Sequence, residues 1–166
     1  MNNPKKKVKK SGHLFWITGV SGAGKTSVGK KIKKFVQLNF GPTILLNGDD
    51  LRDVFKLKGY SRNERLKIGM IYINFLKLII SQNINVIFTV VGLFDQLRII
   101  NKKYFKNYNK IYIKANVSKI IKKNKKKTYK KNKKNIWGID ITPEFPKKPL
   151  IIIKNTENKC NNKKRL

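Results

Sequence analysis

The stretch LFWITGVSGAGKTS, residues 14–27, decides the fold of this chain. Residues 13–18 are rich in aromatic and branched apolar side chains, a composition typical of a buried strand. Residues 19–26 match the pattern GxxxxGK[ST], and the apolar residues of 25–39 recur at roughly helical spacing. A glycine-rich loop that directly follows a strand and opens a helix is the context in which this pattern folds as a phosphate-binding loop, or P-loop.

The chemistry of a P-loop requires these residue types. Glycines let backbone N–H groups turn inward around phosphates, and the helix N-terminus adds partial positive charge. We expect Lys25 to reach the β- and γ-phosphates of ATP and the Thr26 hydroxyl to ligate Mg²⁺. The alternative, a glycine turn with a chance Lys-Thr pair, leaves the strand–loop–helix context unexplained. The predicted nucleotide-binding residues are Gly19, Ser21, Gly22, Ala23, Gly24, Lys25, Thr26 and Ser27.

Further along the chain, short apolar runs alternate with helical patterns. We expect strands at 43–46, 86–91, 110–115 and 150–154, and helices at 62–82 and 94–104. Strands that are apolar on both faces and alternate with helices predict a mainly parallel sheet covered by helices on both sides. The expected fold class is therefore α/β, a three-layer fold of the P-loop NTPase type. We expect a basic arm over 1–12, the P-loop domain over 13–154 and a polar tail over 155–166.

Length and composition exclude several classes of protein. A chain of 166 residues with 40% hydrophobic residues is long enough for one domain with a core. Its one cysteine, Cys160, excludes a disulfide framework and a cysteine zinc site. The basic N-terminus has no apolar segment typical of a secretory signal, and no apolar run approaches the ~20 residues that span a bilayer. We therefore expect a cytoplasmic protein with no membrane partner.

The formal net charge of +32 raises the alternative of a nucleic-acid-binding protein on a degenerate P-loop scaffold. The lysines are scattered among Asn and Ile residues, however, and all three have A/T-rich codons. The basic tracts also lack the interleaved aromatic residues of single-strand binding surfaces. Genome composition therefore explains the charge more simply than a nucleic-acid partner does. With only eight acidic residues in the chain, each one is informative.

Two of these acidic residues lie in NGDDLR, residues 47–52, directly after the second predicted strand. Residues just past the carboxyl end of a parallel strand face the ligand crevice. A carboxylate there, beside a P-loop, suits Mg²⁺ coordination and acceptance of a proton from an attacking hydroxyl. We assign these roles to Asp49, with Thr26 as the other metal ligand. The alternative is that Asp49 or Asp50 merely caps the next helix.

The segment GYSRNER, residues 59–65, opens the long predicted helix. Ser61 and Glu64 have the spacing of a capping box, which accounts for both. Tyr60 and Arg65 remain unexplained by capping. An aromatic face with a guanidinium suits the base and an anionic group of a nucleotide acceptor.

From about residue 14 to 155 the chain resembles the adenylylsulfate kinase (APS kinase) family, which phosphorylates the ribose 3′-hydroxyl of adenosine 5′-phosphosulfate. WITGVSGAGKTS is close to the family's WLTGLSGAGKST, NGDDLR to DGDNVR, and GYSRNER to GFSEEDR. Near the end, WGIDITPEFPKKPLIII is similar to TGID…YEAPENPDLVL. The resemblance implies transfer of the γ-phosphoryl group of ATP to a nucleotide, as a step of sulfate assimilation. Family members are often dimers, so a homodimer is an expectation.

The resemblance also implies residue roles. Asp49 would be the carboxylate near the metal and the acceptor hydroxyl, and it would share the catalytic work with Lys25. Arg52 and Arg65 would hold the anionic end of the acceptor. Tyr60 replaces a family Phe that packs on the base. The Phe of the lid that clamps the nucleotide corresponds to Ile136, with Trp137 beside it as a substitute.

The departures from the family pattern gather on the acceptor side. A family Asn one turn after Arg65 is Ile68, and the family's FISPYR becomes VVGLFD at residues 90–95. The lid, about residues 119–137, is shortened and rich in Lys and Asn; its alternative is a solvated basic helix. GLFDQLR with a short lid is more similar to an APS-kinase-like branch associated with surface-polysaccharide synthesis. Cytidine diphosphoramidate is therefore an alternative acceptor.

Overall fold

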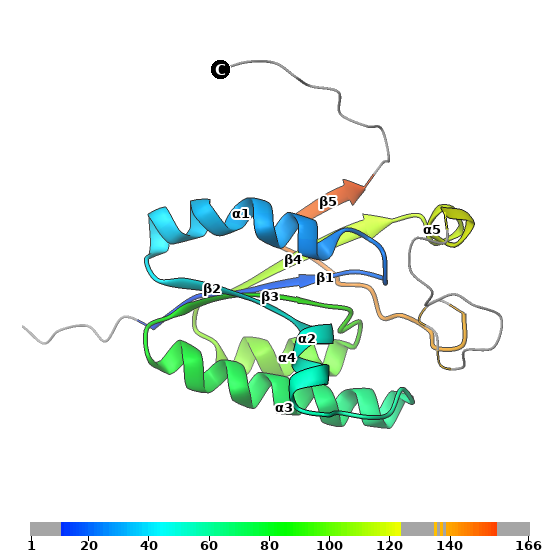
Figure 1. The fold of residues 1–166 in the computed structure, drawn as a ribbon, viewed down its shortest axis with the longest axis horizontal. Helices are drawn as coiled ribbons and strands as arrows, with labels where there is room; N and C mark the ends of the chain where they lie inside the picture. The colour runs from blue at the N-terminus through cyan, green and yellow to red at the C-terminus, as the bar shows by residue number, and fades with distance from the viewer. Residues whose placement is uncertain (1–10, 124–134, 136, 138, 156–166) are drawn as a thin grey trace, which may run out of the picture.

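The computed structural model describes residues 11–123, 135, 137 and 139–155. A five-stranded sheet with parallel neighbours lies at its centre, in the order β2-β3-β1-β4-β5 (Figure 1). Its strands are β1 (Leu14–Thr18), β2 (Thr43–Asn47), β3 (Asn85–Val90), β4 (Tyr108–Ala115) and β5 (Ile151–Asn155). Because all strands run the same way, the loops that follow β1, β2 and β3 emerge at one edge of the sheet.

Helices cover both faces of the sheet. They are α1 (Lys25–Phe40), α2 (Gly48–Val54), α3 (Arg62–Ser81), α4 (Asp95–Tyr104) and α5 (Val117–Lys123). Figure 1 shows α1 on one face and α3 with α4 on the other. At Gly29 of α1, a Cβ atom would lie 2.9 Å from side-chain carbons of Leu45 and Thr89, so the helix approaches the sheet closely. The predicted three-layer α/β fold is confirmed.

Alternation of side chains along the strands divides the core into two layers. Every residue of β1 is buried, and on the α3 side the Trp16 ring lies 5.2 Å from the Phe88 ring. Phe88 in turn contacts Tyr72 of α3, with ring centroids 5.4 Å apart. Two members of this aromatic layer, Trp16 and Tyr72, also line the second pocket described below.

The strands and helices agree with the predicted ones to within two residues at nearly every end, and the differences bear on function. Strand β5 ends at Asn155, the residue from which we expect the polar tail to begin. Helix α5 occupies the start of the predicted lid. The rest of the lid through residue 134, most of the basic arm (1–10) and the remainder of the tail (156–166) lie outside the described residues.

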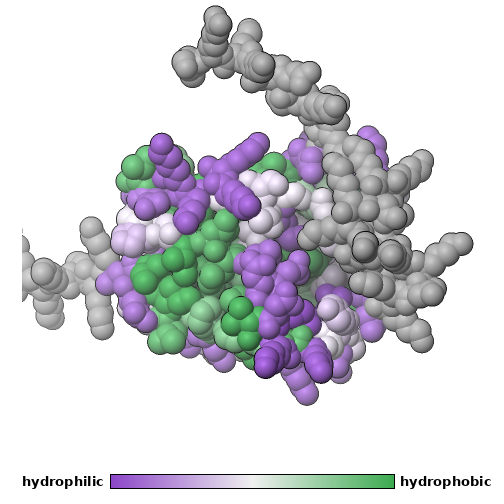
Figure 2. Space-filling view, viewed as in Figure 1, coloured by the Kyte–Doolittle hydropathy of each residue, from purple (hydrophilic) through white to green (hydrophobic). Residues whose placement is uncertain are grey.

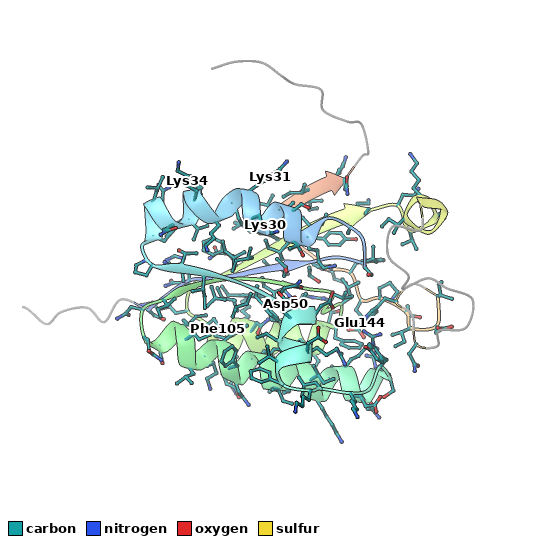
Figure 3. All side chains as sticks on the ribbon, viewed as in Figure 1. Lys30, Lys31, Lys34, Asp50, Phe105 and Glu144 are labelled. Atoms are coloured by element: carbon teal, nitrogen blue, oxygen red, sulfur yellow. The ribbon has the colours of Figure 1, made fainter. Side chains whose placement is uncertain are left out.

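The surface of the described part bears on the interpretation of the charge. Lys30, Lys31 and Lys34 are exposed and point outward from α1 (Figure 3). Figure 2 shows an apolar area between α1 and α3 on this face. In α1 the lysines therefore form a solvated face. Among the described residues, no helix is long and apolar enough to cross a bilayer.

Candidate active site

The P-loop connects β1 to α1 at the edge of the sheet where the strands end. Gly22 and Gly24 have φ angles of 80° and 93°, in the left-handed region that favours glycine. Gly24 is the N-cap of α1 and, because it has no side chain, makes no side-chain cap hydrogen bond. Gly24 therefore offers no side-chain partner to the first N–H groups of α1, and an anion bound in the loop would satisfy them.

Two contacts hold the loop from outside. A Cβ atom at Gly22 would lie 2.8 Å from a methyl carbon of Ile120, so α5 packs on the loop. The Asn155 Nδ2 donates a hydrogen bond of 3.0 Å to the Ala23 carbonyl oxygen. Asn155 was not among the predicted site residues, although it stands where a parallel strand ends at the ligand edge.

Lys25 lies across the loop. Its Nζ donates a 2.8 Å hydrogen bond to the Val20 carbonyl oxygen. The ammonium group is therefore already at the mouth of the loop, where the terminal phosphates of a bound nucleotide would lie.

A pocket opens over these atoms, and we call it the P-loop pocket. It is lined by Ser21, Gly22, Gly24, Lys25, Thr26, Ser27, Asn47, Asp49, Val90 and Val91. Six of the eight predicted nucleotide-binding residues therefore line one cavity. Ala23 is buried beneath it, and Gly19 lies at the end of β1, where a Cβ atom would lie 2.7 Å from the Ile113 carbonyl oxygen.

The carboxylates after β2 occupy the first turn of α2. The N-cap of this helix is Asn47, whose side-chain oxygen accepts a 3.4 Å hydrogen bond from the Asp49 backbone N–H. The alternative in which Asp49 or Asp50 caps the helix is therefore wrong for both residues. The Asp50 carboxylate accepts a hydrogen bond from Asn47 Nδ2, while Asp49 lines the P-loop pocket.

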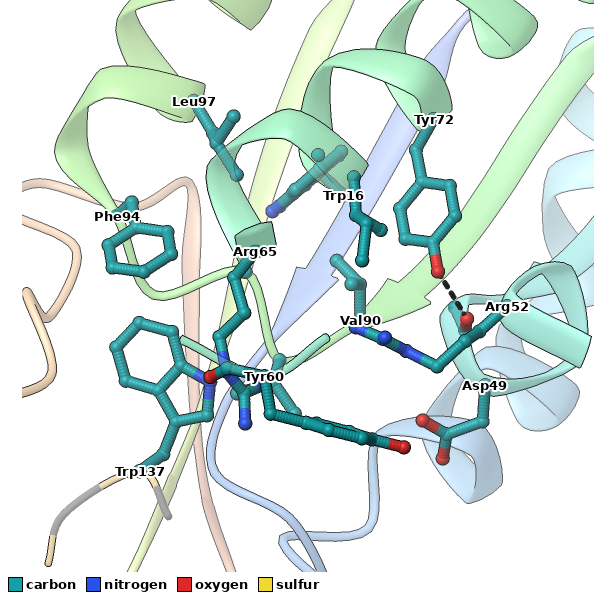
Figure 4. A pocket seen from close by; sticks show the side chains of 15 residues that line it. Trp16, Asp49, Arg52, Tyr60, Arg65, Tyr72, Val90, Phe94, Leu97 and Trp137 are labelled. Atoms are coloured by element: carbon teal, nitrogen blue, oxygen red, sulfur yellow. Dashed lines mark hydrogen bonds between the residues drawn. The ribbon is translucent and has the colours of Figure 1, made fainter. Parts of the chain in front are cut away.

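A second cavity adjoins the first, and we call it the aromatic pocket (Figure 4). The predicted acceptor residues Asp49, Arg52, Tyr60 and Arg65 all line it. Its other lining residues are Trp16, Gly48, Ile68, Gly69, Tyr72, Val90, Val91, Gly92, Phe94, Leu97 and Trp137. Asp49, Val90 and Val91 belong to both pockets. Asp49 is thus the one acidic residue of the described chain that faces both cavities.

Two arginines and a tyrosine form a stack at the mouth of the aromatic pocket. The guanidinium carbons of Arg52 and Arg65 lie 4.6 and 5.3 Å from the centre of the Tyr60 ring. Arg52 donates to the carbonyl oxygens of Leu57 and Gly59, and Arg65 donates to that of Tyr60. Each guanidinium is therefore held in place by backbone oxygens before any ligand binds.

The electrostatics of this stack favour an anion. Burial, and secondly the positive charge of Arg52, lowers the pKa of Arg65. Two cations that are held near each other and partly withdrawn from water repel each other. A negative group between them offsets this repulsion. On the far side of the pocket, burial raises the pKa of Tyr72 to about 12. Its neutral hydroxyl donates a 2.8 Å hydrogen bond to the Gly48 carbonyl and so anchors the start of α2 beside Asp49.

Residues 11–154 match the family model described as adenylylsulphate kinase. The chain belongs to the adenylylsulphate kinase family. It is therefore a kinase, a phosphotransferase that binds nucleotides, as the P-loop and the adjoining pocket also indicate.

Two curated relatives of this APS kinase family member differ in their acceptors. The chain is 31% identical over 159 residues to a cytidine diphosphoramidate kinase of Campylobacter jejuni, covering 93% of this chain and 91% of that protein. It is 32% identical over 168 residues to an adenylyl-sulfate kinase of Clostridium acetobutylicum, covering 95% of this chain and 84% of that protein. The two identities are nearly equal.

The fold agrees with that of a solved family member. The APS kinase of Mycobacterium tuberculosis, in complex with AMPPNP and APS, superposes with a TM-score of 0.79 at 20% identity. The match covers 89% of this chain and 91% of that one. At this identity the likeness supports the fold, and the site of our APS kinase family member is argued from its own residues.

Two pocket residues of this APS kinase family member, Trp16 and Phe94, were given no role in the site from the sequence. Trp16 and Phe94 are fully or almost fully buried, and their apolar sequence surroundings indicate core residues. Trp137 is 5% exposed, and its ring lies 4.5 Å from that of Phe94 and 5.5 Å from the Arg65 guanidinium. Ile136, the predicted clamp residue, lies outside the described residues. Trp137, named beside it as a substitute, does line the pocket.

The residues present fit a magnesium ion bound together with a nucleotide. In the described part of the chain no three His, Cys, Asp or Glu residues cluster as a metal site. Mg²⁺ in kinases, however, takes only one or two protein ligands and completes its shell with phosphate and water oxygens. Thr26 and Asp49 line the same pocket and supply a hydroxyl and a carboxylate, the donor types that Mg²⁺ prefers.

Proposed function

We propose that the protein transfers the γ-phosphoryl group of ATP to the 3′-hydroxyl of adenosine 5′-phosphosulfate. The position of Asp49 carries the proposal, because this carboxylate lies in the P-loop pocket and in the aromatic pocket at once. A phosphoryl donor bound in the first cavity and a hydroxyl acceptor bound in the second would meet beside it. In-line transfer requires this arrangement.

The P-loop would hold the donor. Backbone N–H groups at the start of α1 would bind phosphate oxygens, and Lys25 would exchange its contact with Val20 for the terminal phosphates. Bound Mg²⁺, held by Thr26 and Asp49, would supply positive charge at the β- and γ-phosphates. Both effects stabilise the negative charge that shifts between donor and acceptor in the transition state.

Asp49 would orient the acceptor. Its exposed carboxylate can accept a hydrogen bond from the attacking hydroxyl and take up the proton. The anchoring of α2 by Asn47 and Tyr72 keeps this carboxylate at the junction of the two pockets. A positioned general base contributes about 10²- to 10⁴-fold to such a reaction.

The stack of Arg52, Tyr60 and Arg65 would hold the rest of the acceptor. The two guanidinium groups suit its phosphosulfate, and the rings of Tyr60 and Trp137 present aromatic faces to a base. An anionic nucleotide satisfies both halves of this pocket. A neutral alcohol would leave the two arginines unpaired with any anion.

Cytidine diphosphoramidate is the second candidate acceptor. Ile68, which lines the aromatic pocket, and the segment from Val90 to Phe94 depart from the APS kinase pattern on the acceptor side. The relative with that activity also aligns over 91% of its own length. Ile68 stands where the family has an Asn, so one hydrogen-bonding partner for the acceptor is missing from the pocket. The preferred acceptor can therefore differ from that of APS kinases.

The decisive experiment compares the two acceptors side by side. Purified protein with ATP and Mg²⁺ is assayed for ADP release with adenosine 5′-phosphosulfate and with cytidine diphosphoramidate. We expect a higher kcat/KM with adenosine 5′-phosphosulfate, and the reverse order would assign the second candidate. The Lys25→Ala variant should lose activity about a hundredfold or more with either acceptor, whereas Lys30→Ala, an exposed change on the same helix, should not.

A further inference from the structure

Glu144 joins three segments of the chain (Figure 3). Its carboxylate accepts a 2.5 Å hydrogen bond from the Asp95 backbone N–H and forms a 2.5 Å ion pair with Arg62. Its own backbone N–H donates to the Leu93 carbonyl at 2.9 Å, and its carbonyl accepts a hydrogen bond from Arg98. Glu144 therefore binds the first residue of α3, the first residue of α4 and the loop before α4.

The contact with Asp95 replaces a missing helix cap. Phe94 is the N-cap of α4 and offers no side-chain hydrogen bond, so the N–H of Asp95 depends on Glu144, 49 residues later in sequence. A carboxylate at a helix N-terminus is also favoured by the helix dipole. The hydrogen bond from Asp95, and secondly Arg62, lowers the pKa of Glu144, so the group is ionised at neutral pH.

The same contacts border the aromatic pocket. The Arg62 guanidinium lies 4.8 Å from the centre of the Phe94 ring, and the Trp137 ring packs on Phe94 at 4.5 Å. Trp137 is also bridged to Ile141 through the backbone. Arg62, Phe94 and Trp137 therefore make consecutive contacts from the Glu144 ion pair to the wall of the pocket.

We propose that Glu144 is a positioning residue for the aromatic pocket: it ties the segment that carries Trp137 to the starts of α3 and α4 and so holds the indole in the pocket wall. Ring contacts of the kind made by Trp137 are individually weak. Hydrogen bonds to an ionised group are roughly twice as strong as neutral ones. The Glu144 contacts are thus the firmer anchor of this segment. The kinetic consequence rests on the proposed function, whereas the structural one does not.

The structural consequence is tested by acrylamide quenching of tryptophan fluorescence. The chain has two tryptophans, and Trp16 is fully buried. In Glu144→Gln we expect about twofold stronger quenching, because the segment with Trp137 opens locally. In a Trp137→Phe background the same substitution should change nothing. Arg62→Gln, which removes the ion pair and the guanidinium contact with Phe94 but keeps the hydrogen bond from Asp95 to Glu144, should give a smaller increase. This variant serves if Glu144→Gln fails to fold. Unchanged quenching in both variants would overturn the proposal.

The kinetic consequence is a selective loss of acceptor affinity. In Glu144→Gln the KM for the acceptor should rise about five- to tenfold, less than for the direct loss of a charge-assisted hydrogen bond, because Glu144 acts on the pocket through Trp137. The KM for ATP should stay within about twofold. Glu144→Asp, which keeps the charge, should recover part of the loss, and Asp53→Asn controls for the removal of one exposed negative charge. Equal increases in both KM values would indicate general destabilisation and overturn the proposal. If the parent turns over neither acceptor, the proposed function fails, and the quenching experiment alone decides this inference.

Discussion

The Asn155 side chain donates a hydrogen bond of 3.0 Å to the carbonyl oxygen of Ala23, which joins the last strand to the P-loop across 132 residues of sequence. Ala23 stands between Gly22 and Gly24, whose φ angles are 80° and 93°. The amide of Asn155 therefore braces the part of the loop whose backbone N–H groups would surround the phosphates.

Asn155→Ala should weaken the binding of ATP without changing the KM for the acceptor. Loss of one neutral hydrogen bond of about 0.5–1.5 kcal/mol corresponds to a roughly two- to tenfold rise in the KM for ATP. Steady-state kinetics with each substrate varied in turn measure this directly. Lys154→Ala, a change at the exposed neighbouring position, is the matched control. A rise in the acceptor KM alone would contradict the assignment of Asn155 to the P-loop.

Asp49→Asn and Asp50→Asn form a matched pair in the first turn of α2. Both carboxylates are exposed, but only Asp49 lines the two pockets. Asp49→Asn should reduce kcat by about 10²- to 10⁴-fold, since the amide cannot accept the proton of the attacking hydroxyl. Asp50→Asn should change kcat by less than about threefold, because Asp50 lines neither pocket. Rapid-quench measurements of the chemical step test the difference, and equal losses in the two variants would refute the role of Asp49.

Arg65→Gln should weaken the binding of the acceptor and leave the binding of ATP unchanged. Its guanidinium lies over Tyr60 and Trp137 in the aromatic pocket, and Arg65 does not line the P-loop pocket. Loss of an ionic hydrogen bond of about 1.5–3 kcal/mol predicts an acceptor KM raised about 10- to 100-fold. The exposed Lys67, on the same helix, provides Lys67→Gln as a control for lost positive charge. An unchanged acceptor KM in Arg65→Gln would show that this pocket does not bind the acceptor.

The stability of the protein should fall slightly as the pH drops below about 6.5, because of His13. Burial lowers the pKa of His13 below the ordinary value of a histidine, about 6.5. The Phe40 ring, 4.5 Å away, is one of the groups that cover it. The fold thus favours the neutral imidazole, and stability is complete above the unfolded-state pKa and declines as the pH falls toward the folded-state pKa. Melting temperatures at about pH 7.5 and 5.5 should differ less in His13→Gln than in the parent. This is the single histidine of the chain, so an equal difference in both proteins would contradict the prediction.

Much of the fold, together with the P-loop and Asp49, could be predicted from local sequence patterns. The strand, the glycine loop and the helix around Lys25 are contiguous, so composition and spacing predict them together. Asp49 could be placed because it directly follows a strand whose end must face the ligand edge. The capping box of Ser61 and Glu64 is likewise a contact between near neighbours, and the structure contains it. In each of these cases a few consecutive residues contain all the atoms that decide the outcome.

The remaining parts of the site depend on contacts between residues far apart in the chain. Phe94 and Trp137 meet across 43 residues of sequence, and Glu144 caps a helix that begins 49 residues earlier. No periodicity predicts such pairs, because the choice among many apolar or polar partners is made by packing of the whole chain. The N-cap of α2 is Asn47 rather than Asp49 or Asp50, because β2 ends at Asn47 and the helix begins at the next residue. Local backbone preferences therefore specified the P-loop, while long-range packing built the aromatic pocket.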